Sequence, residues 1–233
     1  MKDLWRYGLL GWLLVVATAV PFLTTYADAQ TSPHGEGEDI LTFVPHIVGG
    51  EGEPDGNEPG DCFTAEEAEL LQLLNDYRNQ NGLPDVPFSK SLTAVAQWHV
   101  IDLFDNRPDT GTDPHTGLAC NLHSWSDQGI WSPVCYTSDH TYASGMWDKP
   151  REITGNVYSG NGFENAYRSG GTATAAGAFN GWKNSPGHNA VILEQGIWSN
   201  YDWPAMGVGI YENYAVLWFG DQADPQGIVT QCQ

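Results

Sequence analysis

The chain has 233 residues and a formal net charge of −20 at pH 7, because 29 acidic residues face only nine lysines and arginines. A surface this acidic repels phosphate groups, which argues against nucleic acids and anionic lipid headgroups as partners. Metal cations and basic partners are compatible with such a surface. The same surface is also expected of a soluble protein adapted to a salty exterior.

The first 29 residues have the pattern of a secretory signal peptide. Two basic residues precede an apolar run over residues 9–23, and the small residues of a cleavage site follow at residues 27–29. The run is shorter than the roughly 20 residues of a membrane-spanning helix, and Pro21 interrupts it. An uncleaved anchor is the alternative. We expect secretion, no stable membrane span and a mature N-terminus at Gln30.

Residues 30–61 form an acidic stretch rich in glycine and proline. Its composition offers too little apolar surface to form a core, which predicts a flexible leader. The remaining residues, 62–233, are long enough for one well-packed domain.

Four cysteines lie in the exported part, and an even number in an oxidising compartment predicts two disulfides. Three pairings are possible and the sequence alone does not choose among them. We favour Cys120–Cys135, which closes a short loop, with Cys62–Cys232 joining the two ends of the domain. A zinc–cysteine site is the competing interpretation, but the chain contains no C-x-x-C pair.

Two helices are predicted at the start of the domain. Thr64 and Glu67 fit a capping box, and the apolar repeat that follows predicts a helix ending at Gly82. Ser91 is expected to cap a second helix with an apolar stripe over residues 92–103. His99 lies in this stripe, so we interpret it as a core residue with one hydrogen-bonded ring nitrogen rather than a ligand.

Residues 124–160 form an aromatic-rich insertion within a segment without sustained periodicity. Exposed rings could stack on sugars, but we favour packing as a small secondary core around the short disulfide. The five rings concerned are Trp125, Trp131, Tyr136, Tyr142 and Trp147.

The last third of the chain changes from helical to strand patterns. Residues 172–184 predict a weak helix, and residues 206–210 and 214–219 predict a β-hairpin turning at Glu212 and Asn213. Helices followed by paired strands predict an α+β domain of packed layers.

Four segments, in this order, resemble the CAP superfamily, which comprises cysteine-rich secretory proteins, antigen five and the plant pathogenesis-related group-one proteins. They are residues 74–84 (LNDYRNQNGLP), 92–99 (LTAVAQWH), 120–124 (CNLHS) and 182–193 (WKNSPGHNAVIL). The last is similar to the bacterial form of the family's most specific motif. The domain of this superfamily is also called the SCP domain. The resemblance extends over about residues 64–221 and implies a three-layer α/β/α sandwich.

The resemblance also implies a pocket of two histidines and two glutamates. His123, Glu164 and His188 match the first histidine, the first glutamate and the second histidine. Ser185 stands where the second glutamate is usual, so at most three members are present. Ser185 and Asn165 are expected beside them in one cleft.

Two imidazoles and one carboxylate are a suitable ligand set for Zn²⁺ or another divalent metal, with one position left for water. A hydrogen-bonded polar cluster is the alternative. We therefore predict a secreted CAP-domain protein that binds a small apolar ligand, a glycan or a protein and carries a metal-capable His/Glu cleft, with no catalytic residue assigned. The alternatives are a metal-dependent hydrolase using the same cleft and an interaction or glycan-binding module working through the aromatic insertion.

Overall fold

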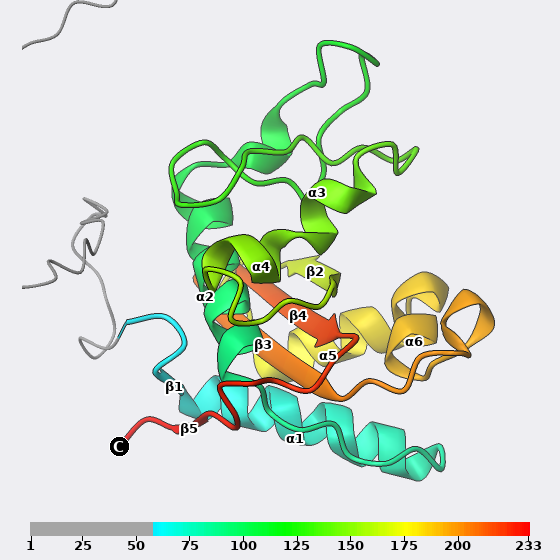
Figure 1. The fold of residues 1–233 in the computed structure, drawn as a ribbon. Coiled ribbons are helices and arrows are strands. Elements are labelled where there is room, and N and C mark those ends of the chain that lie inside the picture. The colour runs from blue at the N-terminus through cyan, green and yellow to red at the C-terminus, as the bar shows by residue number, and fades with distance from the viewer. Residues whose placement is uncertain (1–57) are drawn as a thin grey trace, which may run out of the picture. The chain divides into compact units, whose positions relative to one another are not determined.

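The computed structural model describes residues 58–233 (Figure 1). The predicted signal peptide, residues 1–29, and all but the last four residues of the predicted leader, residues 30–61, lie outside this part. Among the described residues, no helix has both the length and the apolar character needed to cross a membrane.

The centre of the domain is a three-stranded antiparallel sheet with the strand order β2-β4-β3. Its strands are β2 (Gly162–Arg168), β3 (Ala205–Tyr211) and β4 (Tyr214–Gly220). The predicted hairpin is confirmed, since only Glu212 and Asn213 separate β3 from β4. A parallel pair, β1 (Cys62–Phe63) and β5 (Thr230–Gln231), brings the two ends of the domain together.

One face of the sheet is covered by α2 (Lys90–Asp105), which lies along β3 and β4. A Cβ atom at Gly207 would lie 2.3 Å from the carbonyl carbon of Leu92, and one at Gly209 would lie 2.5 Å from the carbonyl oxygen of Ala96. The absence of side chains at these two positions therefore lets the helix lie directly on the strand.

The start of α2 differs from the prediction. Its N-cap is Ser89, whose hydroxyl accepts a hydrogen bond from the Leu92 amide at 3.0 Å. The predicted cap, Ser91, is wrong by two residues: it lies inside the helix and donates to Asp224 at 2.7 Å. Asp224 is 133 residues away in sequence, so local pattern could not show this contact.

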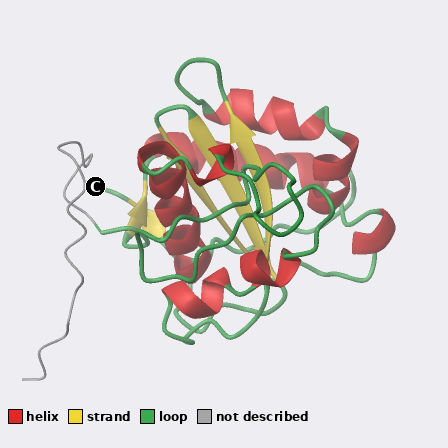
Figure 2. Cartoon of the chain, turned by 90° about the horizontal axis from the view of Figure 1, so that it is seen from above, coloured by secondary structure: helices red, strands yellow, loops and turns green. Residues whose placement is uncertain are grey.

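The opposite face is covered by α1 (Ala65–Gln80) and α5 (Ala175–Lys183), and α6 (Pro186–Ile192) follows α5. Alternate residues of β4 divide between the two faces: Leu217 packs with the α1 and α5 side, and Trp218 with the α2 side. Figure 2 shows the strands between these helices. The predicted α+β, three-layer α/β/α sandwich is therefore confirmed, and so is the Thr64–Glu67 capping box.

The aromatic insertion packs against α2 and the edge strand β2, and it contains two short helices, α3 (Ala143–Trp147) and α4 (Lys149–Ile153). Two further single turns, η1 (Pro108–Thr110) and η2 (Gly196–Trp198), lie outside it. Trp125, Trp131 and Tyr136 are buried, whereas Trp147 is 37% exposed. The expected packing of the insertion on the domain is confirmed, but a separate core around the short disulfide is not, because Trp125 and Trp131 join the core that α2 forms with β4.

Both predicted disulfides are present, Cys62–Cys232 and Cys120–Cys135. Their Cα–Cα distances are 5.0 and 4.9 Å, within the usual range for disulfides. The first joins β1 to the residue after β5, and the second closes a loop within the segment that carries His123.

Candidate functional site

Glu164 is the centre of a group of polar side chains beside the edge strand β2. Its side chain faces α2 and is 0% exposed. Oε1 lies 2.5 Å from Nδ1 of His99, and Oε2 lies 2.7 Å from Nδ1 of His123. His188 makes no hydrogen bond to these three side chains, but His123 and Glu164 lie near enough to shift its pKa, and we call His99, His123, Glu164 and His188 the His–Glu cluster.

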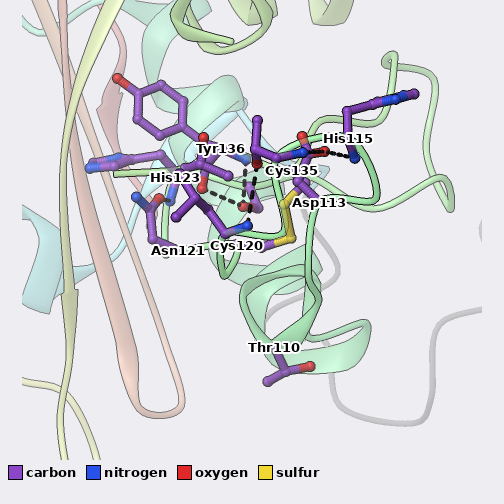
Figure 3. The surroundings of a disulfide bond; sticks show 12 residues. Thr110, Asp113, His115, Cys120, Asn121, His123, Cys135 and Tyr136 are labelled. Atoms are coloured by element: carbon purple, nitrogen blue, oxygen red, sulfur yellow. Dashed lines mark hydrogen bonds between the residues drawn. A yellow bond between two sulfur atoms is a disulfide. The ribbon is translucent and has the colours of Figure 1, made fainter. Parts of the chain in front are cut away.

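His123 is held by the disulfide loop, as Figure 3 shows. Cys120 and Cys135 fix the two sides of this loop. Between them, the Asn121 amide donates to the Tyr136 carbonyl at 2.9 Å, and the Asn121 side-chain oxygen accepts from the His123 amide at 3.0 Å. The Tyr136 ring packs edge-on against the imidazole, with 5.2 Å between ring centroids. The disulfide therefore positions the backbone from which His123 reaches Glu164.

His99 is a member of the cluster that the sequence analysis missed. It is fully buried in α2, and its imidazole stacks on Trp125 with 4.0 Å between centroids and an interplanar angle of 6°. Its Nε2 lies 3.0 Å from the carbonyl oxygen of Ser124. The prediction of a core residue with one satisfied nitrogen is thus corrected, since both nitrogens have partners. The sequence did contain a signal for this, because His99 lies in an apolar stripe. A buried imidazole there needs a hydrogen-bond partner at each nitrogen.

The hydrogen-bond pattern assigns charges to this group. Burial alone would raise the pKa of Glu164, but the charges and hydrogen bonds of His99 and His123 outweigh it, and the net pKa is lowered from 4.5. The carboxylate is therefore ionised near neutral pH. Because the Ser124 carbonyl can only accept, both nitrogens of His99 face acceptors and both carry protons. His99 is then an imidazolium, and its stacking on an indole ring stabilises that charge.

His123 and His188 are the members of the cluster that solvent reaches. The His123 side chain is 21% exposed, and because its Nδ1 faces the carboxylate, Nε2 is its free nitrogen. His188, on α6, is half-buried. Burial and the neighbouring His123 lower the pKa of His188 from 6.5 against the opposing effect of Glu164, so its ring is neutral at pH 7. In the described part of the chain, neither His123 Nε2 nor the His188 ring has a hydrogen-bond partner.

The two expected neighbours lie close to His188. Asn165 donates from its side-chain nitrogen to the His188 carbonyl at 3.1 Å, while its own side-chain oxygen is buried without a partner in the described residues. Ser185 is the N-cap residue of α6, three positions before His188, and its hydroxyl makes no capping bond. A serine is too short to replace the glutamate usual at this place.

A family model described as CAP, the cysteine-rich secretory protein family, matches residues 71–219. The chain belongs to the CAP family. No curated protein sequence matches it.

Three solved structures resemble this CAP chain at low identity. An extracellular protein containing an SCP domain from Bacillus anthracis is 19% identical over 67% of this chain and 40% of its own, with a TM-score of 0.43. A cysteine-rich secretory protein from Staphylococcus aureus is 19% identical over 72% and 41%, with a TM-score of 0.40. An outer surface protein from Borrelia burgdorferi is 18% identical over 69% and 96%, with a TM-score of 0.42. The chain thus spans about two fifths of the first two proteins.

The arrangement of the cluster restricts metal binding. Within residues 58–233, no group of three or more His, Cys, Asp or Glu side chains is placed to hold a metal ion. Both oxygens of Glu164 already face imidazole nitrogens, which leaves His123 Nε2 and the His188 ring, one fewer than the usual three protein ligands. In the arrangement of the described residues, the cluster presents only these two free ligands, and metal ligation by His123, Glu164 and His188 stays a prediction.

Proposed function

We propose that this chain is an extracellular CAP-domain protein that acts by binding a ligand or partner at the His–Glu cluster rather than by turnover. The predicted signal peptide and the two disulfides support an exported protein. The observation that carries the binding role is the pair of half-buried imidazoles, His123 and His188, whose free nitrogens meet no partner in residues 58–233.

The charge balance of the cluster favours an uncharged or cationic ligand that donates hydrogen bonds. His188 offers a neutral ring, and the free Nε2 of His123 lies on the side of its imidazole that faces away from the Glu164 carboxylate. The overall charge of −20 adds repulsion against anions.

Turnover has less support from these residues. Within residues 58–233, neither the His123 ring nor the His188 ring is hydrogen-bonded to a hydroxyl or thiol that could act as a nucleophile. The metal-dependent hydrolase remains the alternative, and it requires a rearrangement that frees Glu164. Activity abolished by a chelator and restored by Zn²⁺ would favour it.

Native mass spectrometry of the protein purified from its own culture medium tests the binding proposal. We expect wild-type protein to carry a copurified molecule that a His123→Ala/His188→Ala double variant lacks. His115→Ala is the matched control, because this histidine is exposed in a neighbouring loop and makes no side-chain contact with the cluster. An adduct retained by the double variant would place the ligand elsewhere, and wild-type protein without one would contradict a small-molecule ligand.

A further inference from the structure

A second surface collects three partly exposed aromatic rings from segments that are distant in sequence. Trp147 ends α3, Trp198 ends η2 and Tyr201 follows it. All three pack around Phe163 of β2, with ring centroids 6.1, 5.3 and 5.2 Å from the Phe163 ring. We call Trp147, Trp198 and Tyr201 the aromatic platform.

The rings of the platform pack on buried aromatic residues and are themselves partly exposed. Tyr201 stacks on buried Trp203 at 4.7 Å, and Trp203 stacks in turn on buried Phe219 at 5.2 Å. Trp147 is 37% exposed, and Trp198 and Tyr201 are half-buried. Ile197, next to Trp198, is 82% exposed, more than any other large apolar side chain in the described part. The rings are therefore fixed in place while retaining accessible surface.

The polar groups of the platform have no hydrogen-bond partner among the described residues. Inside the core, Trp203 Nε1 donates to the Val191 carbonyl at 2.9 Å. By contrast, the indole N–H groups of Trp147 and Trp198 and the Tyr201 hydroxyl have no partner among residues 58–233. Partly exposed rings with free polar edges suit a ligand that is apolar on one side and hydrogen-bonding on the other.

Hydrogen-bonding side chains also accompany the rings along the chain. Ser199 and Asn200 lie between Trp198 and Tyr201 in the chain, Asp202 follows Tyr201, and all three polar residues are exposed. Their side chains make no hydrogen bond within the described residues. The platform thus combines partly exposed aromatic rings, with Trp198 and Tyr201 tilted by 55° to each other, with neighbouring polar side chains that make no hydrogen bond among the described residues.

We infer that the aromatic platform binds an uncharged carbohydrate. A sugar ring presents a C–H face that stacks on an aromatic ring, and its hydroxyls can pair with the free polar groups around it. A purely apolar partner would leave these groups unpaired, at a cost in free energy. Anionic polymers and anionic membranes are repelled by the charge of −20.

This site lies on the other face of the sheet from Glu164 and His99, and it does not depend on the proposed function. Phe163 and Glu164 are consecutive residues of β2, so their side chains point to opposite faces of the sheet. Phe163 belongs to the core on the α1 and α5 side, whereas Glu164 contacts His99 of α2.

Titration of the ¹⁵N-labelled full chain with chitohexaose and cellohexaose tests the inference, with the indole N–H signals as the readout. We expect one of these uncharged oligosaccharides to shift the Trp147 and Trp198 signals. Trp147→Ala and Trp198→Ala should each weaken binding about tenfold, or about 1.4 kcal/mol. Tyr201→Phe, which removes only a hydroxyl, should weaken it less.

Two controls separate the platform from other surfaces. Phe104→Ala removes an aromatic residue of similar exposure (39%) from α2, and it should bind like wild type. His123→Ala/His188→Ala should also bind normally, even if it loses the ligand of the His–Glu cluster. Thermal unfolding checks that each variant is folded.

The inference is overturned if neither oligosaccharide shifts the two indole signals at a concentration of about 10 mM. The Kd would then be above about 10 mM, which corresponds to a binding free energy weaker than about 3 kcal/mol. It is equally overturned if Phe104→Ala loses as much affinity as Trp147→Ala. Self-association of wild-type protein that Trp147→Ala abolishes would identify the surface as an interface between copies of this chain instead.

Discussion

The domain buries two glutamates in contrasting surroundings. Glu67, at the start of α1, accepts hydrogen bonds from the Thr64 amide at 2.8 Å, from the Gln97 side chain at 3.0 Å and from the Ile210 amide at 3.1 Å. These donors are all neutral. Glu164 instead lies between two imidazoles. Both glutamates are almost fully buried, at 1% and 7% exposure.

Their pKa values shift in opposite directions. Burial raises the pKa of Glu67 above 4.5, and its hydrogen bonds only partly offset this. The same burial acts on Glu164, but His99 and His123 reverse its effect. The charge of the partners therefore decides which of the two carboxylates is stabilised as an anion, and burial alone does not. Glu67 ties α1 to α2 and β3, whereas Glu164 orients an imidazole that solvent reaches.

The largest expected effect comes from removing the charge that compensates Glu164. His99→Leu leaves a buried carboxylate without its imidazolium, and we expect a loss of about 3–5 kcal/mol in the free energy of unfolding. Urea unfolding near pH 7 measures it. The double variant His99→Leu/Glu164→Leu should recover part of the loss, because the pair is then replaced as a whole. A single variant within about 0.5 kcal/mol of wild type would contradict an ion pair here.

A smaller loss in the free energy of unfolding is expected when Glu67 is changed. Glu67→Gln replaces one accepting oxygen with an amide nitrogen that faces N–H donors, which should cost about 1–3 kcal/mol. Glu69→Gln, an exposed position of α1, is the matched control and should stay within about 0.5 kcal/mol of wild type. Equal effects in the two variants would show that the buried hydrogen bonds of Glu67 contribute nothing.

The pH dependence of unfolding should separate the two sites by sign. The stabilisation from Glu164 is complete above its unfolded pKa of about 4.5 and is lost as the pH falls through its lower folded pKa. The cost of ionised Glu67 is present near pH 7 and is relieved as the pH falls through its raised pKa towards 4.5. Relative to Glu164→Gln, wild type should therefore lose stability on acidification. Relative to Glu67→Gln, it should gain. The same sign for both differences would contradict the comparison.

The smallest effect is expected at His188. Its ring has no hydrogen-bond partner in the described residues, so His188→Ala should change the free energy of unfolding by less than about 1 kcal/mol. Thermal or urea unfolding at about pH 7 measures it. A larger loss would mean that His188 supports the fold in the way His99 does, rather than being available to a ligand.

The local sequence pattern predicted those features of the fold that depend on residues close together in the chain. The Thr64–Glu67 capping box and the β3–β4 hairpin follow from residues a few positions apart. The two disulfides were among three possible pairings, and His123, Glu164 and His188 came from the family resemblance.

The remaining features depend on contacts between distant residues. His99 meets Glu164 across 65 positions, and its apolar neighbours along α2 suggested an ordinary core residue. The aromatic platform likewise joins the insertion to the segment after α6, and no periodicity connects them. The sequence located the rings but not which of them remain exposed.

The central claim is that Glu164 is an anion stabilised by an imidazolium, whereas Glu67 is not stabilised as an anion. Carbon-13 NMR titration of the side-chain carboxyl groups, assigned with Glu164→Gln and Glu67→Gln, tests it most directly. We predict that the Glu164 signal titrates below the ordinary 4.5 and that the Glu67 signal titrates above it. A Glu164 carboxyl that takes up its proton above 4.5 would contradict the account, because His99 could not then be its charged partner.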